Sequence, residues 1–428
     1  MGPQVTRRRP RPQLPTASEF GRKHRPDYVL VVLCAALLAI GLVVVFAISP
    51  ALSQAAKVSN SFFVSRQLIA IALAIVAFIA TAQIPLHVWK ALAKPMLIIA
   101  GTATLVALVT PVNPAYPAHR WVRLGTLSFQ SVELVKFAVL LAVSGFLASR
   151  IKDETVNTVQ STFKPLLIAT LVLGVFIAGP QKVHAQSDLG SMMVLIAMLG
   201  AMLFVAGLKL RTIALAVGIL AIGIILVVLP SAYRRDRLTS FLHPEANCQD
   251  AGYQACQALI AVGSGGMAGL GLGRSVQAYG YLPEAANDSI FAIYAEKFGF
   301  IGCVILLGLL AALFGRLKQI AERAPDDFSR LLVCGVLAWI SVQAIINIGA
   351  MIGLLPLKGI TLPLVSYGGT SVIFVAAAIG LVFQVSKYTS FSAPIQNEKL
   401  IIGRQGNDNS RDGRRFRGAY HPDPSGRR

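Results

Sequence analysis

Long apolar runs separated by short polar segments dominate the pattern of this chain. A membrane-spanning helix needs about 20 mostly apolar residues, and ten runs reach or approach that length. The predicted spans are residues 28–48, 64–81, 92–110, 131–148, 165–180, 190–207, 212–230, 289–314, 331–354 and 370–386. The pattern therefore predicts an all-α, polytopic integral membrane protein with about ten transmembrane helices. One long loop, residues 231–289, separates spans seven and eight.

The composition excludes the main alternatives to a membrane protein. The mean hydropathy of the chain is +0.66, and only 14% of its residues are charged, whereas a soluble domain is about 25% charged. A chain this apolar is neither a soluble enzyme nor largely disordered. The first apolar run lacks a small-residue cleavage pattern, so it is predicted to span the membrane rather than to serve as a signal peptide.

The positive charges orient the predicted bundle. The formal net charge is +20, from 39 Lys and Arg residues against 19 Asp and Glu residues. With the N-terminus in the cytoplasm, 27 of the 39 fall in cytoplasmic segments and 10 in outer segments, as the positive-inside rule requires. Residues 1–27 and 387–428 are therefore predicted to be disordered, basic cytoplasmic tails rather than nucleic-acid-binding arms. Residues 28–386 form the transmembrane domain, with loop 231–289 outside the cytoplasm.

Polar side chains suited to catalysis or binding gather at the outer ends of the predicted spans. They are Arg120, Trp121, Arg123, Asp188, Arg234, Arg235, Asp236, Arg237, Glu284, Asp288 and Lys358. A transporter with alternating access places its key groups near the midplane of the membrane. The one-sided distribution instead favours an enzyme or a receptor that acts on a molecule in the outer leaflet.

Several of these residues have both a structural and a functional interpretation. Glu133 and Lys136 share a helix face at i,i+3 and are either a mutually neutralising pair or part of a polar site. Asp288 precedes span eight, where it is either a helix N-cap or a general base at the membrane surface. Trp121 is either an interfacial residue or a packing surface for a sugar or a lipid head group.

The glycine-rich run and the cysteines complete the candidate features. Residues 263–273 lack the spacing of a nucleotide-binding loop, so no nucleotide is expected. The run is predicted to mark a tight turn or a close backbone approach, and amide contacts to a phosphate are the alternative. Cys248 and Cys256 share one loop, and whether they pair is left open. No zinc-binding motif occurs in the chain.

Eight short motifs occur in order along the ten-span chain. They are Arg120-Trp121 with Gln130-Ser131-Val132-Glu133-Leu134-Val135-Lys136, Gln186-Ser187-Asp188-Leu189-Gly190, Arg237-Leu238-Thr239-Ser240-Phe241 with Pro244, Gly252-Tyr253-Gln254, the glycine-rich run, Tyr281-Leu282-Pro283-Glu284 leading to Asp288, Asn347 with Leu355-Pro356-Leu357-Lys358-Gly359-Ile360-Thr361-Leu362-Pro363, and Ser366-Tyr367-Gly368-Gly369. Over residues 28–386 the chain resembles the SEDS (shape, elongation, division and sporulation) family of membrane glycosyltransferases, which includes FtsW and RodA.

The resemblance implies that the protein polymerises lipid II into glycan strands of peptidoglycan outside the cytoplasmic membrane. It implies that Asp288 is the essential acid of the outer loop. Six further residues match positions around the outer cavity of the family: Arg120, Trp121, Glu133, Lys136, Asp188 and Arg237. Arg123 and Glu284 are further candidates for substrate binding, and Lys358 favours a division-type member over an elongation-type member.

The resemblance also implies partners, a location and a cofactor. The expected partners are a class B penicillin-binding transpeptidase, other divisome membrane proteins and membrane lipids. A multi-pass protein of the bacterial cytoplasmic membrane, with both termini in the cytoplasm and enriched at the division septum, is expected. A divalent cation, Mg²⁺ or Mn²⁺, is an expected helper for the diphosphate leaving group, although the metal ligands are unknown.

The chain departs from the family pattern at a few positions, and two other functions remain open. Proline is usual where Ser131 and Ser187 stand, Thr-Asp-Phe is usual at residues 287–289, and a second acid is usual at Lys297. The first alternative function is a lipid II flippase, which predicts polar groups along a path through the bundle. The second is a non-catalytic divisome scaffold, which predicts that the outer charges are dispensable.

Overall fold

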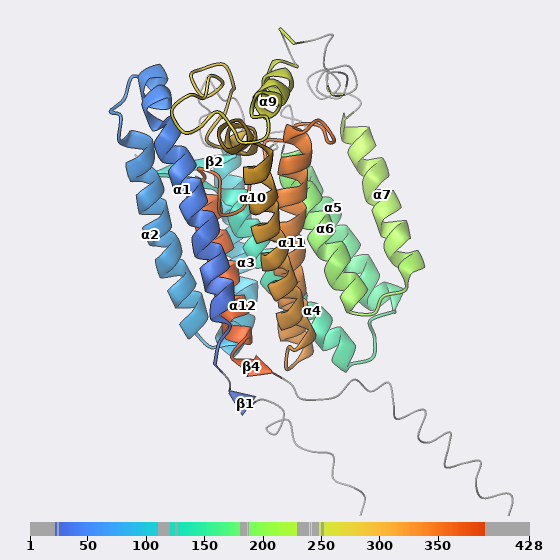
Figure 1. Ribbon diagram of the computed structural model, residues 1–428. Helices are drawn as coiled ribbons and strands as arrows, with labels where there is room; N and C mark the ends of the chain where they lie inside the picture. The colour runs from blue at the N-terminus through green and yellow to red at the C-terminus, as the bar shows by residue number, and fades with distance from the viewer. Residues whose placement is uncertain are drawn as a thin grey trace, which may run out of the picture. The chain divides into compact units, whose positions relative to one another are not determined.

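The computed structural model describes residues 22–23, 25–109, 120–124, 127–179, 186, 188–228, 239, 241, 248–249 and 252–389. Within them lies a bundle of long helices (Figure 1). The helices of the bundle are α1 (Tyr28–Ala56), α2 (Phe62–Gln83), α3 (Leu86–Val109), α4 (Ser131–Lys152), α5 (Lys164–Ala178), α6 (Leu189–Val205), α7 (Leu210–Val228), α10 (Ile290–Glu322), α11 (Asp327–Met351) and α12 (Gly369–Val385).

These ten helices coincide with the ten predicted spans, so the predicted fold class is confirmed. Seven segments are long and apolar enough to cross a membrane, and α6, α7 and α12 are shorter apolar helices. The predicted tails lie almost entirely outside the described residues. In addition, a short π-helix, η2 (Val159–Phe163), leads directly into α5.

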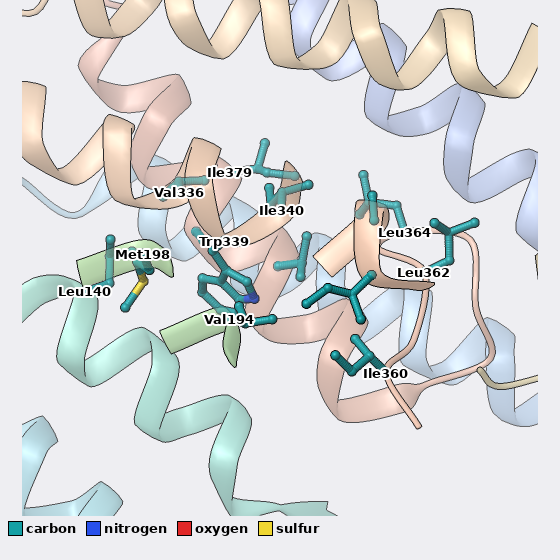
Figure 2. Packing of buried hydrophobic residues seen from close by; sticks show 14 of the residues in the cluster. Leu140, Val194, Met198, Val336, Trp339, Ile340, Ile360, Leu362, Leu364 and Ile379 are labelled. Atoms are coloured by element: carbon teal, nitrogen blue, oxygen red, sulfur yellow. The ribbon is translucent and has the colours of Figure 1, made fainter. Parts of the chain in front are cut away.

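The core of the bundle lies where α4, α6 and α11 meet. Trp339 of α11 is fully buried, and Figure 2 shows it packed among Leu140, Val194 and Met198. The segment between α11 and α12 returns into this core through the buried side chains of Ile360, Leu362, Leu364 and Val365. This return segment is therefore anchored by hydrophobic burial, although it has no regular secondary structure over residues 355–362.

Small residues let α2 and α12 pack with their backbones close together. A Cβ on Gly380 would lie 2.0 Å from the Thr81 hydroxyl oxygen and 2.5 Å from the Phe78 carbonyl oxygen. Ala70, Ala74 and Ala376 are buried in the same two helices. Lipid is as apolar as a leucine side chain, so helices in a membrane associate through close packing of this kind.

Several short elements cover the two ends of the bundle. A hairpin of β2 (Trp121–Leu124) and β3 (Leu127–Gln130) precedes α4, and helix α9 (Tyr253–Ser264) lies at the same end, where α10 begins (Figure 1). At the opposite end β1 (Arg22–Lys23) pairs antiparallel with β4 (Tyr388–Thr389). Neither the hairpin nor α9 was predicted from the apolar pattern, because both are short and lie within loops.

The glycine-rich run lies against a break in α10. Gly299 has φ 63° and ψ −164°, which interrupts the helix. The amides of Leu270 and Gly271 donate to the carbonyls of Glu296 and Lys297 over 2.9 and 3.0 Å, and the amide of Phe300 donates to Gly266 over 2.9 Å. A Cβ on Gly265 or on Gly269 would lie 2.1 Å from a carbonyl oxygen of α10. The prediction of a close backbone approach is therefore confirmed.

Glu296 and Lys297 use their side chains to hold the same outer segment. The Glu296 carboxylate accepts from the Ser275 hydroxyl and, over 2.9 and 3.1 Å, from the amides of Val276 and Gln277. Lys297 donates to the Leu272 carbonyl over 2.7 Å. Lys297 therefore supplies a donor for a loop carbonyl, at the position where the resemblance predicts a second acid.

Candidate functional site

Asp288 lies at the entrance to α10 and is largely buried, with 9% of its surface exposed. Ser289, and not Asp288, is the N-cap residue of α10, so the N-cap interpretation of Asp288 is wrong. The Asp288 carboxylate oxygen Oδ1 accepts a hydrogen bond from Gln254 Nε2 of α9 over 3.4 Å. Its backbone carbonyl accepts from Asn347 Nδ2 of α11 over 2.7 Å. Two helices thus fix this residue.

Arg120 and the return segment between α11 and α12, which carries Lys358, meet close to Asp288. A Cβ on Gly359 would lie 3.6 Å from Asp288 Oδ2 and 3.9 Å from an Arg120 guanidinium nitrogen, so both groups approach this glycine. Asp288, Lys358 and Gly359 line the same small pocket. Positive charge in the neighbourhood of this carboxylate suits the binding of an anionic substrate.

Asn347 ties this segment to the helix that carries it. Its Nδ2 donates to the carbonyl of Ile360 as well as to that of Asp288, each over 2.7 Å. Its Oδ1 is buried and has no hydrogen-bond partner among the described residues. The side chain also lines the pocket of Asp288. The Asn347 amide nitrogen therefore fixes two backbone segments, and its amide oxygen can accept a further hydrogen bond.

Arg120 is held by the segment that leads into α6. Its Nε donates to the Gln186 carbonyl over 3.0 Å, and Gln186 Nε2 donates to the Ser131 hydroxyl over 2.6 Å. Ser131 is the first residue of α4. Trp121 follows in β2 and is 38% exposed, as a residue that meets a substrate or the membrane interface must be. Arg123 lies in the same strand, but its side chain falls outside the described residues.

Asp188 is the N-cap residue of α6. Its carboxylate accepts from the amide and the hydroxyl of Ser191 over 3.0 and 2.8 Å, and it is 2% exposed. Gly190, two residues later, faces the return segment, because a Cβ there would lie 3.1 Å from the Lys358 carbonyl oxygen. Asp188 therefore positions the first turn of α6 against the segment that carries Lys358.

Glu133 and Lys136 form a buried ion pair in α4. Lys136 Nζ lies 2.7 Å from Glu133 Oε1 and 3.1 Å from Gln343 Oε1, and 5.0 Å from the centre of the Trp339 ring. Gln343 Nε2 donates to the carbonyl of Thr361 over 3.1 Å. The interpretation as a neutralising pair is confirmed. The pair also extends into a network that reaches the return segment, and Glu133 Oε2 has no partner among the described residues.

The end of the return segment clamps the loop that carries Asp288. The Ser366 hydroxyl donates to the Asn287 carbonyl over 2.7 Å and accepts from the Leu362 amide over 2.7 Å. The Tyr367 amide donates to the Ala286 carbonyl over 2.8 Å. Burial raises the pKa of the Tyr367 phenol, and the nearby Arg66 guanidinium opposes that shift. Tyr367 therefore stays neutral at physiological pH.

The remaining predicted residues lie apart from this cluster or outside the described residues. Glu284 is exposed, has φ 51° and accepts a hydrogen bond from the Asn287 side chain. Arg237 lies outside the described residues, as do Arg234 to Asp236. No group of three or more His, Cys, Asp or Glu side chains suited to a metal occurs in the described part of the chain. The prediction of a divalent cation therefore has no ligand set in these residues.

Cys248 and Cys256 form a disulfide bond, which settles the question of their pairing. Cys34, Cys303 and Cys334 are free.

The site also contains residues that the sequence analysis did not name as candidates. Gln343 had no signal at all, and Gln254, Asn347 and Ser366 occurred only within motif matches. Each makes its contacts with residues distant along the chain, which no local pattern encodes.

Comparison with known proteins places this architecture in one family. The family model of the FtsW, RodA and SpoVE cell cycle proteins matches residues 28–391. A protein of Coxiella burnetii named "Probable peptidoglycan glycosyltransferase FtsW" is 36% identical over 85% of this chain and 96% of its own length. Stage V sporulation protein E of Bacillus subtilis is 33% identical over 86% of this chain and 99% of its own length.

Solved structures agree with the sequence relatives. One chain from a peptidoglycan synthase complex, described as coordinating polymerisation and crosslinking, superimposes with a TM-score of 0.67 at 28% identity, over 85% of this chain and 98% of that chain. The rod shape determining protein RodA of Thermus thermophilus superimposes with a TM-score of 0.61 at 27% identity, over 85% of this chain and 97% of that chain. The chain therefore belongs to the FtsW/RodA/SpoVE family of multi-pass membrane proteins, the SEDS family.

Proposed function

We propose that this protein is a peptidoglycan glycosyltransferase that polymerises lipid II at the outer face of the bacterial cytoplasmic membrane during cell division. Family membership and the FtsW relatives support the reaction class. The observation that carries the proposal is the position of Asp288. Its carboxylate accepts a hydrogen bond from Gln254, and Arg120 and the pocket lined by Lys358 lie close to it at one end of an apolar bundle.

The arrangement supports a direct glycosyl transfer. Asp288 takes the proton from a sugar hydroxyl of the acceptor, and that oxygen attacks the anomeric carbon of the donor. The bond from this carbon to the diphosphate breaks, and the lipid diphosphate leaves with the bonding electrons. A positioned general base contributes about 10²- to 10⁴-fold to such a step. The small pocket beside Asp288 receives the reacting groups, and the lipid tails lie against the helices.

The leaving diphosphate requires positive charge. Arg120 and Lys358 supply it from two separate elements. The Arg120 side chain is held by the Gln186 carbonyl, and Lys358 lines the pocket of Asp288. Lys136 is 1% exposed and paired with Glu133, so its part in this proposal is to support the return segment rather than to contact the substrate. A bound Mg²⁺ or Mn²⁺ would add charge to the same leaving group.

The two rival functions make different predictions. A flippase requires polar groups along a path through the bundle. The buried charges of Glu133 and Lys136 in α4 neutralise each other in place, so they do not supply such a path. A scaffold requires no catalytic carboxylate.

We further propose a class B penicillin-binding transpeptidase as partner and the division septum as location. The synthase complex whose subunit shares this fold supports the partner.

The test compares the wild-type protein with Asp288→Asn, each reconstituted with its cognate transpeptidase and labelled lipid II. Asparagine keeps the size of the side chain and removes the base. Asp327→Asn, the same change at the exposed first turn of α11 on the opposite side of the membrane, is the matched control. Glycan strands are resolved on gels, and lipid II binding is measured separately.

We expect polymer from the wild type and from Asp327→Asn, and at least 100-fold less from Asp288→Asn with binding retained. Equal polymer from both Asp variants would remove Asp288 from the mechanism. If no protein makes polymer, a fluorescence assay of lipid II translocation in vesicles distinguishes the flippase from the scaffold.

A further inference from the structure

Gln254 is the side chain that contacts the Asp288 carboxylate from α9. Its Nε2 lies 3.4 Å from Asp288 Oδ1 and 3.1 Å from the Ser289 hydroxyl oxygen. The Ser289 hydroxyl itself lies 2.9 Å from the Pro283 carbonyl and donates to it. The two hydrogens of one amide nitrogen thus point at the two residues that open α10.

The hydrogen-bond inventory fixes the orientation of this amide. An ionised Asp288 only accepts, and the single Ser289 hydrogen is already donated to a carbonyl, so both neighbours of the amide must be acceptors. Only the NH₂ end of Gln254 satisfies both. The carboxylate is therefore held in one orientation, and its charge is stabilised by a donor that comes from outside its own loop.

A disulfide fixes the start of the helix that carries Gln254. Cys256 lies in the first turn of α9, two residues after Gln254, is 6% exposed and is bonded to Cys248. Its amide donates to Gly252 over 2.9 Å at the helix start. Further along, Ala258 and Ala261 are buried, and Leu259 lies 3.2 Å from the position of a Cβ on Gly353. The far half of α9 is held by packing, and the near half carries the covalent bond to Cys248.

We propose that Gln254 is a positioning residue for Asp288 and that the Cys248–Cys256 disulfide keeps it there, so that a dithiol reductant slows the enzyme. In the reaction the S–S bond breaks and two S–H groups form, while the dithiol loses two electrons and two protons and becomes a cyclic disulfide. Cys248 is half-buried and is the more exposed of the two cysteines. The effect on rate rests on the proposed function, whereas the coupling of α9 to the Asp288 loop does not.

The first test replaces the amide with an apolar group of similar length. Gln254→Met is compared with Gln257→Met, the same change one turn later in the same helix on a side chain of similar, half-buried exposure. We expect Gln254→Met to lower kcat about three- to tenfold, as the loss of one oriented hydrogen bond does. KM is expected to change less than kcat. Gln257→Met is expected to match the wild type.

The pH–rate profile separates positioning from general destabilisation. Removing a donor from a carboxylate favours its protonated form, so the acidic limb of kcat moves to higher pH in Gln254→Met. Among the described residues, the charged side chains near Asp288 on other elements are Arg120 and Lys358, and Glu284 shares its loop; none of them changes in this variant. An unshifted profile with wild-type kcat would refute the role of Gln254.

The second test reduces the wild-type complex with dithiothreitol and compares it with Cys248→Ser/Cys256→Ser, which contains no disulfide to reduce. We expect reduction to slow the wild type and to leave the double variant unchanged. Hydrogen exchange of the backbone over residues 284–292 is followed in the same samples and is expected to speed up on reduction. This readout needs no activity, so it still tests the coupling if no polymer forms. Unchanged exchange and unchanged rate would refute the role of the disulfide, even if the double variant fails to fold.

Discussion

Replacing Gly269 with alanine tests the contact between the glycine-rich run and α10. Gly269 has φ 81°, where an L-residue costs about 1–2 kcal/mol. The added methyl carbon would also lie 2.1 Å from the Lys297 carbonyl oxygen and 2.4 Å from its carbon. Backbone cannot move aside as a side chain can, so overpacking adds about 1–3 kcal/mol. We expect Gly269→Ala to lower the free energy of unfolding by about 2–5 kcal/mol in total.

The assay is thermal unfolding of the protein in lipid nanodiscs, and two glycines of the same run serve as controls. Gly271 has φ 88° and open space around its Cβ position, so Gly271→Ala carries the conformational cost alone. Gly263 lies inside α9 with open space, so Gly263→Ala is neutral or stabilising by about 0.5–1 kcal/mol. We expect Gly269→Ala to melt about 4–10 °C below the wild type. Equal melting temperatures for Gly269→Ala and Gly271→Ala would refute the close backbone contact.

Three further changes test the network around the site. Lys136→Met leaves a buried carboxylate unpaired and is expected to lower the free energy of unfolding by about 3–5 kcal/mol. The double change Glu133→Gln/Lys136→Met should lower it by less. Thermal unfolding measures both variants, and a larger loss in the double variant would contradict the pairing. Ser366→Ala removes two hydrogen bonds and should cost about 1–3 kcal/mol, measured in the same way. Gly359→Ala places a methyl group 3.6 Å from Asp288 Oδ2, and initial rates should show a lower kcat/KM for lipid II; an unchanged value would place the reacting groups elsewhere.

The apolar pattern predicts the ten spans well because the membrane imposes one simple requirement. Every backbone polar group in the bilayer must be paired within the protein, so length and hydropathy together predict a helix. The elements that the pattern misses lie in the loops. The hairpin β2–β3 and helix α9 are too short for a hydropathy signal, and the break in α10 at Gly299 falls inside a continuous apolar run.

The candidate site is predicted in part, and the limit has a physical cause. Charge and position along the spans bring Asp288, Arg120 and Lys358 to the same end of the bundle, and the structure places them around Gly359. What the sequence does not encode is which neutral amides hold them. Gln343 looks like any other residue of α11, yet it connects Lys136 to the return segment because α4 and α11 pack face to face.

Two serine hydroxyls support the charged residues of the site through neutral side chains. The Ser131 hydroxyl accepts the hydrogen bond of Gln186, whose carbonyl holds Arg120. The Ser289 hydroxyl accepts the second hydrogen of Gln254, whose amide also contacts Asp288. Replacing either serine with a residue that lacks a hydroxyl removes the bond. The orientation of the charged groups therefore depends on hydroxyl and amide side chains, which the distribution of charge along the sequence does not single out.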